Sequence, residues 1–210
     1  VSAASLCHQA WAQVVSRLTG CETVVFGTVL FGRMHGGAGA DRGMGLFINT
    51  LPLKIVVGEE GVESSVLHTQ RLLGDLMRHE HASLALAQRC SGVLAPAPLF
   101  TTLLNYRHSG QTIETPDTDS GSILEGIESL WSEERTNYPL TLSIDDLGED
   151  FSLTAQVHAS IDPMRICDMM NKALDCLVEA LERTPVFSVR NLDVLPEGEP
   201  KLRMQPYVHG

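Results

Sequence analysis

The spacing of apolar and polar positions predicts four helices. Residues 163–183 carry an unbroken apolar stripe along one side, with Asp162 at the N-cap position and Pro163 at the first helical position, a favoured order. Pro185 then ends the segment. The same 3.6-residue period predicts three further helices: residues 4–19 closed by Gly20, a helix capped by Ser64 or Ser65 that runs to about Glu80, and residues 84–89 after the cap Ser83.

A second pattern, rich in β-branched, aromatic and alternating apolar residues, predicts strands. Residues 140–144 and 151–157 alternate apolar and polar side chains around the turn 146–150, which indicates a β-hairpin. Further strands are predicted at residues 24–31, 46–57, 99–107 and 186–194. Helices that alternate with strands, with hairpins among them, favour an α+β two-layer sandwich, a sheet with helices on one face.

A glycine-dense loop, residues 33–45, separates the first two predicted strands. Such glycines permit positive φ angles and close backbone approach. The loop does not match a phosphate-binding motif, because no Lys and Ser/Thr follow its last glycine and a strand, rather than a helix, comes next. We therefore interpret it as a long excursion between two strands.

Composition narrows the function classes. The chain has 210 residues, enough for one good core. Its net charge of −11 repels phosphate backbones, which disfavours nucleic-acid binding. No apolar run is long enough to span a membrane and no signal peptide is evident. The five scattered cysteines contain no Cys-x-x-Cys pair, which favours free thiols and a cytoplasmic location. A first residue Val1 suits a fragment of a longer chain.

Several candidate reactive residues have plainer interpretations. His79 and His81 would point about 200° apart on a helix, so a shared metal ion is not expected, and hydrogen bonds to backbone and carboxylate groups at a helix end are favoured. Cys90 is interpreted as a buried small residue rather than a nucleophile. His158 is predicted to lie within a strand and to face outward.

Polar residues at two strand ends are better candidates for a binding site. Asn105 and Arg107 follow the apolar run that begins at residue 99, and Asn49 and Thr50 interrupt another apolar run. Polar groups where a strand leaves the core often line a cleft. The alternative is structural, with Asn105 satisfying a loop and Arg107 pairing with a carboxylate. The residues by themselves leave both interpretations open.

Four motifs in order carry a resemblance to a known family. Gly45 to Lys54 read GLFINTLPLK, which is similar to the GxFVNTLPLR run of condensation domains of nonribosomal peptide synthetases. Further matches follow in the family's order at residues 79–88, 104–109 and 135–140. The family's HHxxxDG motif, with its central His, has no counterpart, because no two of the eight histidines are adjacent.

The resemblance implies an architecture. Condensation domains resemble two chloramphenicol-acetyltransferase-like lobes around a tunnel, and the matched motifs belong to the second half. We therefore expect residues 1–195 to form the C-terminal lobe, without the catalytic His, and residues 196–210 to be a linker. Residues 33–45 would be the floor loop, and the latch would lie within 108–135. The implied site residues are, in the tunnel, Asn49, Thr50, Asn105 and Arg107, and, in the floor loop, Arg33, Gly36, Gly37, Gly39 and Gly43.

It also implies a function. The full domain would join aminoacyl or peptidyl thioesters, carried on the phosphopantetheine arms of carrier proteins, into amides, with no cofactor or metal bound directly. The expected partners are the N-terminal lobe, peptidyl carrier proteins and a neighbouring adenylation domain, in a bacterial secondary-metabolite pathway. Alone the lobe should be inactive, and its exposed apolar face should make it self-associate. The alternatives are an epimerisation or residue-modifying domain, and a non-catalytic docking or scaffold module.

Overall fold

A computed structural model describes residues 1–32, 45–94, 96–108 and 135–196 of the chain. Arg33, Gly36, Gly37, Gly39 and Gly43 of the predicted floor loop lie outside the described residues, as do residues 109–134 of the predicted latch and residues 197–210 of the predicted linker.

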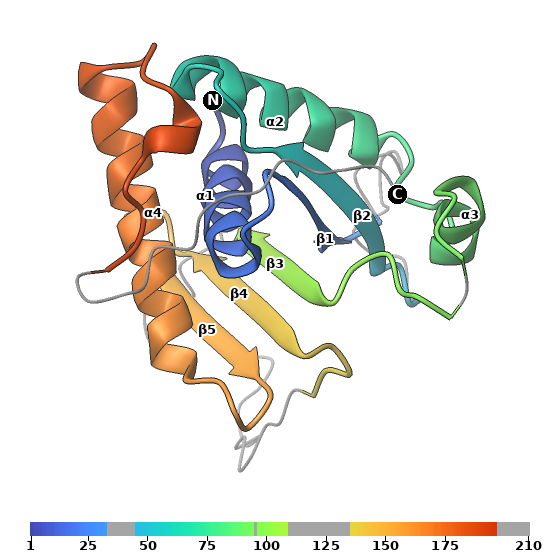
Figure 1. The fold of residues 1–210 in the computed structure, drawn as a ribbon. Helices are drawn as coiled ribbons and strands as arrows, with labels where there is room; N and C mark the ends of the chain where they lie inside the picture. The colour runs from blue at the N-terminus through green and yellow to red at the C-terminus, as the bar shows by residue number, and fades with distance from the viewer. Residues whose placement is uncertain (33–44, 95, 109–134, 197–210) are drawn as a thin grey trace, which may run out of the picture.

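Within the described residues, one five-stranded sheet forms the first layer, in the order β2-β1-β3-β4-β5 (Figure 1). The strands are β1 (Thr23–Leu30), β2 (Asn49–Val56), β3 (Thr102–His108), β4 (Leu140–Asp146) and β5 (Phe151–Val157). β1 pairs antiparallel with β2, and β4 with β5, while β1, β3 and β4 run parallel to one another. The three parallel strands therefore end at the same edge of the sheet, a geometry that places distant residues together.

Helices form the second layer on one face of this sheet. α1 (Ala3–Thr19) packs between α2 (Val62–Met77) and α4 (Pro163–Arg183), and these helices contact the strands beneath them, whereas the short α3 (Leu84–Cys90) lies against β2 at the border of the molecule (Figure 1). Side chains such as Trp11, Phe26 and Leu142 fill the space between the layers with no exposed surface. The predicted α+β two-layer sandwich is confirmed.

Local capping signals explain four helix termini. The Ser2 hydroxyl accepts a hydrogen bond from the Ser5 N–H, and Gly20 closes α1 with a φ of 70°. Ser83 caps α3 and Asp162 caps α4, as their sequences predict. The Asp162 carboxylate accepts from the Met164 N–H at 2.9 Å. Residues close in sequence set these ends, which is why the sequence pattern located the caps Gly20, Ser83 and Asp162; the cap Ser2 was not predicted.

The start of α2 was predicted wrongly. Its N-cap is Gly61 instead of Ser64 or Ser65, and Ser65 is buried inside the helix. Gly61 forms an isolated β-bridge with Ser188, and a Cβ there would lie 3.0 Å from the Pro185 carbonyl oxygen. A contact with a segment more than 120 residues away thus sets this helix end. The helix ends at Met77, three residues before the predicted Glu80.

Other sequence predictions need smaller corrections. Residues 186–194 do not form a strand: apart from the bridge at Ser188, they contain a single 3-10 turn, Val189–Asn191. His158 lies just beyond β5 instead of within a strand, and it is exposed. Cys90 is exposed rather than buried, and none of the other residues of α3 is buried either. Short peripheral segments take their structure from neighbours that the pattern does not reveal.

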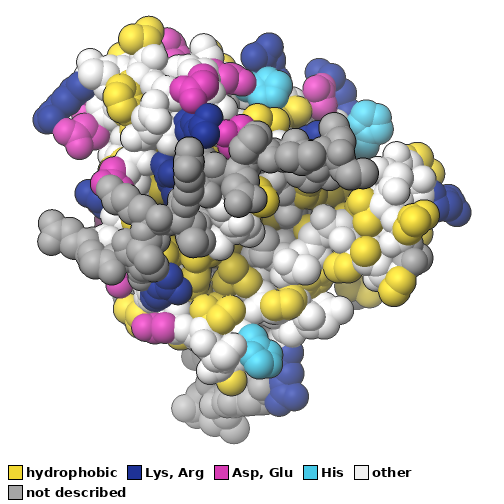
Figure 2. All heavy atoms as spheres, in the orientation of Figure 1, with side chains coloured by type: hydrophobic (Ala, Val, Ile, Leu, Met, Phe, Trp, Pro, Cys, Tyr) yellow, Lys and Arg dark blue, Asp and Glu magenta, His cyan; other side chains and the backbone are white. Residues whose placement is uncertain are grey.

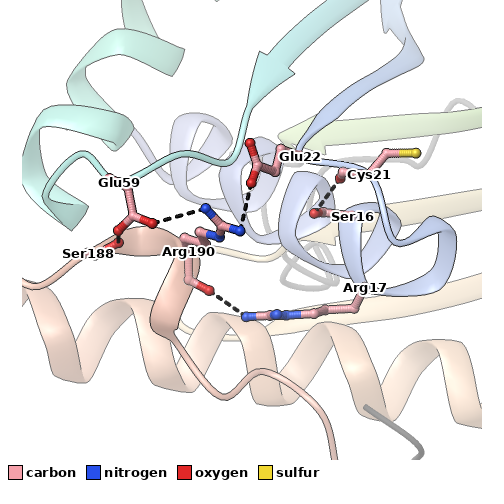
Figure 3. A network of polar contacts seen from close by, with 7 residues as sticks. All are labelled: Ser16, Arg17, Cys21, Glu22, Glu59, Ser188 and Arg190. Atoms are coloured by element: carbon pink, nitrogen blue, oxygen red, sulfur yellow. Dashed lines mark hydrogen bonds and ion pairs between the residues drawn. The ribbon is translucent and has the colours of Figure 1, made fainter. Parts of the chain in front are cut away.

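A polar network fastens the segment after α4 to the rest of the fold (Figure 3). The Arg17 guanidinium donates to the carbonyl oxygens of Arg190 at 2.6 Å and Leu192 at 2.8 Å. The Arg190 guanidinium in turn contacts Glu22 at 2.8 Å and Glu59 at 3.0 Å. These contacts join the end of α1, the segments just before β1 and α2, and the C-terminal segment, which also forms backbone hydrogen bonds with residues 58–63.

Candidate substrate-binding site

A pocket of about 640 Å³ lies at the carboxyl ends of β1 and β3. The first turns of α1 and the second half of α2 form its other walls. Crevices at the carboxyl ends of parallel strands are common ligand sites, and this volume falls in the usual range for them. Apolar side chains, Leu30, Phe31, Leu73 and Met77, line it beside polar ones that include His8, Glu80, Tyr106 and His108.

Asp146, at the end of β4, organises the polar edge of the pocket. Its carboxylate accepts hydrogen bonds from the Tyr106 hydroxyl, from the Gly148 N–H at 2.9 Å and from His108 Nδ1 at 2.9 Å. The hydrogen bonds from Tyr106, Gly148 and His108 lower the pKa of Asp146, so its carboxylate form is favoured. Burial and the Asp146 carboxylate raise the pKa of Tyr106, which therefore keeps its proton.

This geometry determines which nitrogen of the His108 ring carries the hydrogen. A nitrogen that faces a carboxylate must carry the hydrogen, so Nδ1 is the donor. In the neutral ring Nε2 is then a hydrogen-bond acceptor, and the described residues provide no partner for it. His108 is exposed at the mouth of the pocket, so Nε2 is available to a ligand.

His8 lies deeper in the pocket, and both of its ring nitrogens form hydrogen bonds within the fold. Its Nδ1 lies 2.6 Å from the Ala4 carbonyl oxygen, which can only accept, so Nδ1 is protonated. Nε2 then accepts from the Thr28 hydroxyl at 2.6 Å. Complete burial lowers the pKa of His8 to about 4, and the ring is neutral at physiological pH.

The structure separates the four residues predicted for the tunnel. Asn49 points toward the helices and donates to the carbonyl oxygens of Glu80 at 2.8 Å and Ala82 at 2.7 Å, which holds the turn between α2 and α3. Thr50 follows it on β2 and, by the alternation of side chains along a strand, belongs to the other face of the sheet.

Asn105 and Arg107 also belong to the face without helices, because Leu104 and Tyr106 between and beside them pack on the core. Arg107 forms a bidentate ion pair with Asp145, with N–O distances of 2.6 and 2.9 Å. Pairing with a carboxylate is the structural alternative that the sequence left open for Arg107. The Asn105 side-chain oxygen is buried, with no hydrogen-bond partner among the described residues. The assignment of these residues to a tunnel stays a prediction.

The sequence did not single out His8, His108 or Asp146. His108 directly follows the polar run Asn105–Arg107 in the sequence. Its position at the end of the same strand was the signal that could have identified it as a candidate. Asp146 was assigned to a hairpin turn, and only the parallel pairing of β3 with β4 places it opposite His108. The partnership depends on tertiary structure.

The His79–Glu80–His81 run has the helix-end contacts that we expected. His79 Nδ1 bonds to the Asp75 carbonyl oxygen at 2.9 Å, and His81 Nε2 lies 3.7 Å from the buried Glu80 carboxyl. In the described part of the chain, no three His, Cys, Asp or Glu side chains gather as a metal site would require. Nor does any helix within those residues have the length and apolar character needed to cross a membrane.

Comparison with solved structures identifies the fold. The condensation domain of Monacolin K polyketide synthase MokA matches with a TM-score of 0.61 at 19% identity, over 88% of this chain and 42% of that one. A four-domain nonribosomal peptide synthetase, holo-AB3403, solved with AMP and glycine, matches with a TM-score of 0.65 at 12% identity, over 94% of this chain and 16% of that one. The fold is therefore chloramphenicol-acetyltransferase-like.

Sequence comparison identifies the family. The condensation domain model matches residues 1–201, so the chain belongs to the condensation domain family, the acyl-transfer domains of nonribosomal peptide synthetases. Among curated relatives, malpinin synthetase from Mortierella alpina is 50% identical over 207 residues, 99% of this chain and 3% of that protein. Malpibaldin synthetase from the same organism is 51% identical over 199 residues, 95% of this chain and 4% of that protein.

These relatives correct one expectation. Both come from a fungus, so the bacterial origin suggested by the family resemblance is not supported. The chain spans only 3% and 4% of the lengths of these two proteins.

Proposed function

We propose that this chain is the C-terminal lobe of a condensation domain that forms amide bonds between carrier-bound thioesters. In that reaction the amine nitrogen of one substrate attacks the thioester carbonyl carbon of the other. The carbon–sulfur bond breaks, the amine loses a proton, and the carrier's phosphopantetheine thiol is released. The catalytic His and its HHxxxDG motif would come from the N-terminal lobe.

The order of motifs carries this proposal. Residues 45–54, 79–88, 104–109 and 135–140 match runs from the second half of the family, and no HHxxxDG run is present among the eight histidines. The fraction of the MokA domain that the chain covers, 42%, agrees with one lobe of two.

Exposed apolar side chains near β2 and α3 support the proposal that a second lobe covers this surface. Leu46 is 99% exposed and Ile48 is 62% exposed just before β2, and Leu94 beyond α3 is 85% exposed. Figure 2 shows hydrophobic side chains gathered on the surface of α3. Apolar patches of this kind mark surfaces that another protein covers. We assign this surface to the N-terminal lobe, and we expect the lobe without it to self-associate.

The remaining assignments follow from the same proposal. Substrates would arrive on the phosphopantetheine arms of peptidyl carrier proteins, next to an adenylation domain, in the cytoplasm, and no cofactor would bind this lobe directly. Thr50, Asn105 and Arg107 would face the tunnel from the open side of the sheet, and the floor loop and latch would come from residues 33–45 and 108–135.

Reconstitution tests the proposal. The chain would be co-expressed with the first half of a condensation domain from its parent gene, and the pair mixed with two loaded carrier proteins. Intact-mass analysis of the carriers should show an amide product with both halves, and none with either half alone. Amide formation by this chain alone would overturn the proposal. Inversion of the substrate's α-carbon would indicate an epimerisation domain, and carrier binding without turnover would indicate a scaffold module.

A further inference from the structure

Another pocket, of about 430 Å³, lies at the amino ends of the parallel strands, at the opposite edge of the sheet from His108. It is lined by the starts of β1, β3 and β4, by the end of α1 and by the start of α4, and we call it the amino-edge pocket. Its lining residue Thr102 lies on the same side of β3 as Leu104 of the core. The pocket is therefore on the helix-covered side of the sheet, opposite the open face.

The two strands β1 and β3 diverge at this pocket. Their pairing joins Gly27 to Leu103 and Thr28 to Leu104, and in the described part of the chain no earlier residue of β1 pairs with β3. Apolar side chains that pack on the core are only partly covered here, namely Leu18, Leu140 and Ile161. Apolar surface that the fold itself leaves uncovered in a pocket favours a ligand with an apolar body.

A polar group of the pocket lining has unused hydrogen-bonding capacity. Thr102 is only 6% exposed, and its hydroxyl oxygen has no hydrogen-bond partner among the described residues. By contrast, the hydroxyl of Thr19, an exposed lining residue, donates to the Val15 carbonyl oxygen at 2.8 Å. Buried hydroxyls without a partner are uncommon in folded proteins, so the lining is incomplete without a bound molecule.

Charge in the pocket favours an anion. Among the described residues that line it, Arg165 is the only charged one, and neither Asp nor Glu is present. The chain as a whole has a net charge of −11, so this local positive charge runs against the overall charge. Asp162 lies nearby in sequence, but its carboxylate caps α4 through the Met164 N–H and does not line the pocket. A guanidinium group matches the two oxygens of a carboxylate in geometry as well as in charge.

We propose that the amino-edge pocket binds a small molecule with an apolar body and one carboxylate, which pairs with the Arg165 guanidinium. The apolar body would lie against Leu18, Leu140 and Ile161. A volume of about 430 Å³ is toward the small end of the usual range for ligand sites, so the ligand is a small aliphatic or aromatic acid. This site is independent of amide formation, because the proposed tunnel lies on the other face of the sheet.

Binding of a pair of matched probes tests the proposal. 4-Phenylbutyrate would be titrated into the ¹⁵N-labelled chain and followed by two-dimensional NMR, with 4-phenylbutylamine as a probe of similar size and opposite charge. We expect a Kd on the order of 1 mM for the acid and binding at least about tenfold weaker for the amine. Backbone signals of Leu18, Val25 and Ile166 should shift, because these residues line the pocket. The acidic surface of the chain attracts the amine, so a preference for the acid must come from the pocket.

Cys21 provides a second, independent measurement. It lines the pocket and is partly exposed, and its sulfur points away from the polar network around Arg190 (Figure 3). Saturating 4-phenylbutyrate should slow alkylation of Cys21 by iodoacetamide at least about threefold, because the bound acid covers the thiol. Cys90 is exposed and does not line the pocket, so its rate of alkylation should not change. Peptide mass mapping reports both rates from one sample.

Substitutions of Arg165 locate the carboxylate. Arg165→Met removes the charge but retains an apolar stem, and it should weaken binding of the acid about tenfold, whereas Arg165→Lys should retain part of the affinity. Arg78→Met is the matched control, because it removes an equal charge from an exposed arginine outside the pocket, and it should leave the affinity unchanged. The measurements on the wild-type chain do not depend on any variant folding correctly.

Several outcomes would overturn the inference. They are an absence of shifts at the pocket residues at roughly 10 mM acid, equal binding of the acid and the amine there, equal protection of Cys21 and Cys90, and unchanged affinity in Arg165→Met. Preference for the acid, protection of Cys21 alone and its loss in Arg165→Met would support it. Failure of amide formation after reconstitution would refute the proposed function and leave this binding result unchanged.

Discussion

Nε2 of His8 lies 2.6 Å from the Thr28 hydroxyl oxygen, across the interface between α1 and β1. With Nδ1 bonded to Ala4, the ring is completely satisfied in its neutral form. Protonation would replace the acceptor at Nε2 by a donor and place a charge in the core. The relationship therefore couples the stability of the fold to pH.

Burial lowers the pKa of His8 from 6.5 to about 4, so the unfolded chain binds a proton at this site more readily than the folded chain. Stability from this residue is present above pH 6.5 and is lost as the pH falls toward 4, by about 3 kcal/mol in total. Urea unfolding of wild type and His8→Gln across this range should show a steeper loss for wild type. An exposed control, His68→Gln, should follow wild type, and parallel curves for all three proteins would contradict the prediction.

Asn49 should matter for stability through the turn it holds. Its side-chain amide donates to the carbonyl oxygens of Glu80 and Ala82, and its oxygen accepts from the Thr50 N–H at 2.9 Å. Asn49→Ala should lower the free energy of unfolding by about 2 kcal/mol, because two carbonyls lose their donor. Thr50→Ala on the same strand should cost less than about 0.5 kcal/mol. Equal losses in chemical denaturation would argue against this role.

Gly27 and Gly74 form a matched pair of glycines with opposite surroundings. A Cβ on Gly27 would lie 2.3 Å from Leu103 and 2.4 Å from Phe100, whereas nothing lies within 4 Å of one on Gly74. Gly27→Ala should destabilise the fold by about 1–3 kcal/mol through overpacking. Gly74→Ala, in the middle of α2, should stabilise it by about 0.5–1 kcal/mol. Thermal unfolding of both variants tests whether Gly27→Ala lowers and Gly74→Ala raises the stability. An unchanged stability in Gly27→Ala would contradict the prediction, because it would mean that Leu103 and Phe100 can move to make room for the added methyl group.

Arg190 should hold the C-terminal segment in place. Its guanidinium contacts Glu22 and Glu59 while its carbonyl accepts from Arg17 (Figure 3). Arg190→Ala should lower stability by about 1 kcal/mol and hasten proteolytic cleavage near residues 186–194, because the segment loses both of its Arg190 ion pairs and keeps mainly its backbone hydrogen bonds to residues 58–63. Arg78→Ala, which removes an exposed pair with Asp75, should change neither measurement. Limited proteolysis with mass mapping distinguishes the two.

Much of the fold follows from local sequence. The apolar stripe at 163–183 with Asp162 and Pro163 locates α4, and the alternation around residues 146–150 locates the β4–β5 hairpin. These signals suffice because a helix or a hairpin depends on residues a few positions apart. The start of α2 at Gly61 and the lack of a strand at 186–194 were missed, since each segment is shaped by the other across more than 120 residues.

The site divides in the same way. The sequence by itself determined the family, through motifs such as residues 45–54, and it marked polar strand ends at Asn49 and Asn105. Only the tertiary structure decided which polar groups meet: Asn49 turns toward the helices while Asn105 faces away, and His108 joins Asp146, 38 residues later. The physical reason is the parallel pairing of β3 with β4, which brings the ends of the two strands side by side. These ends are far apart along the chain, so no periodic pattern in the sequence predicts their contact.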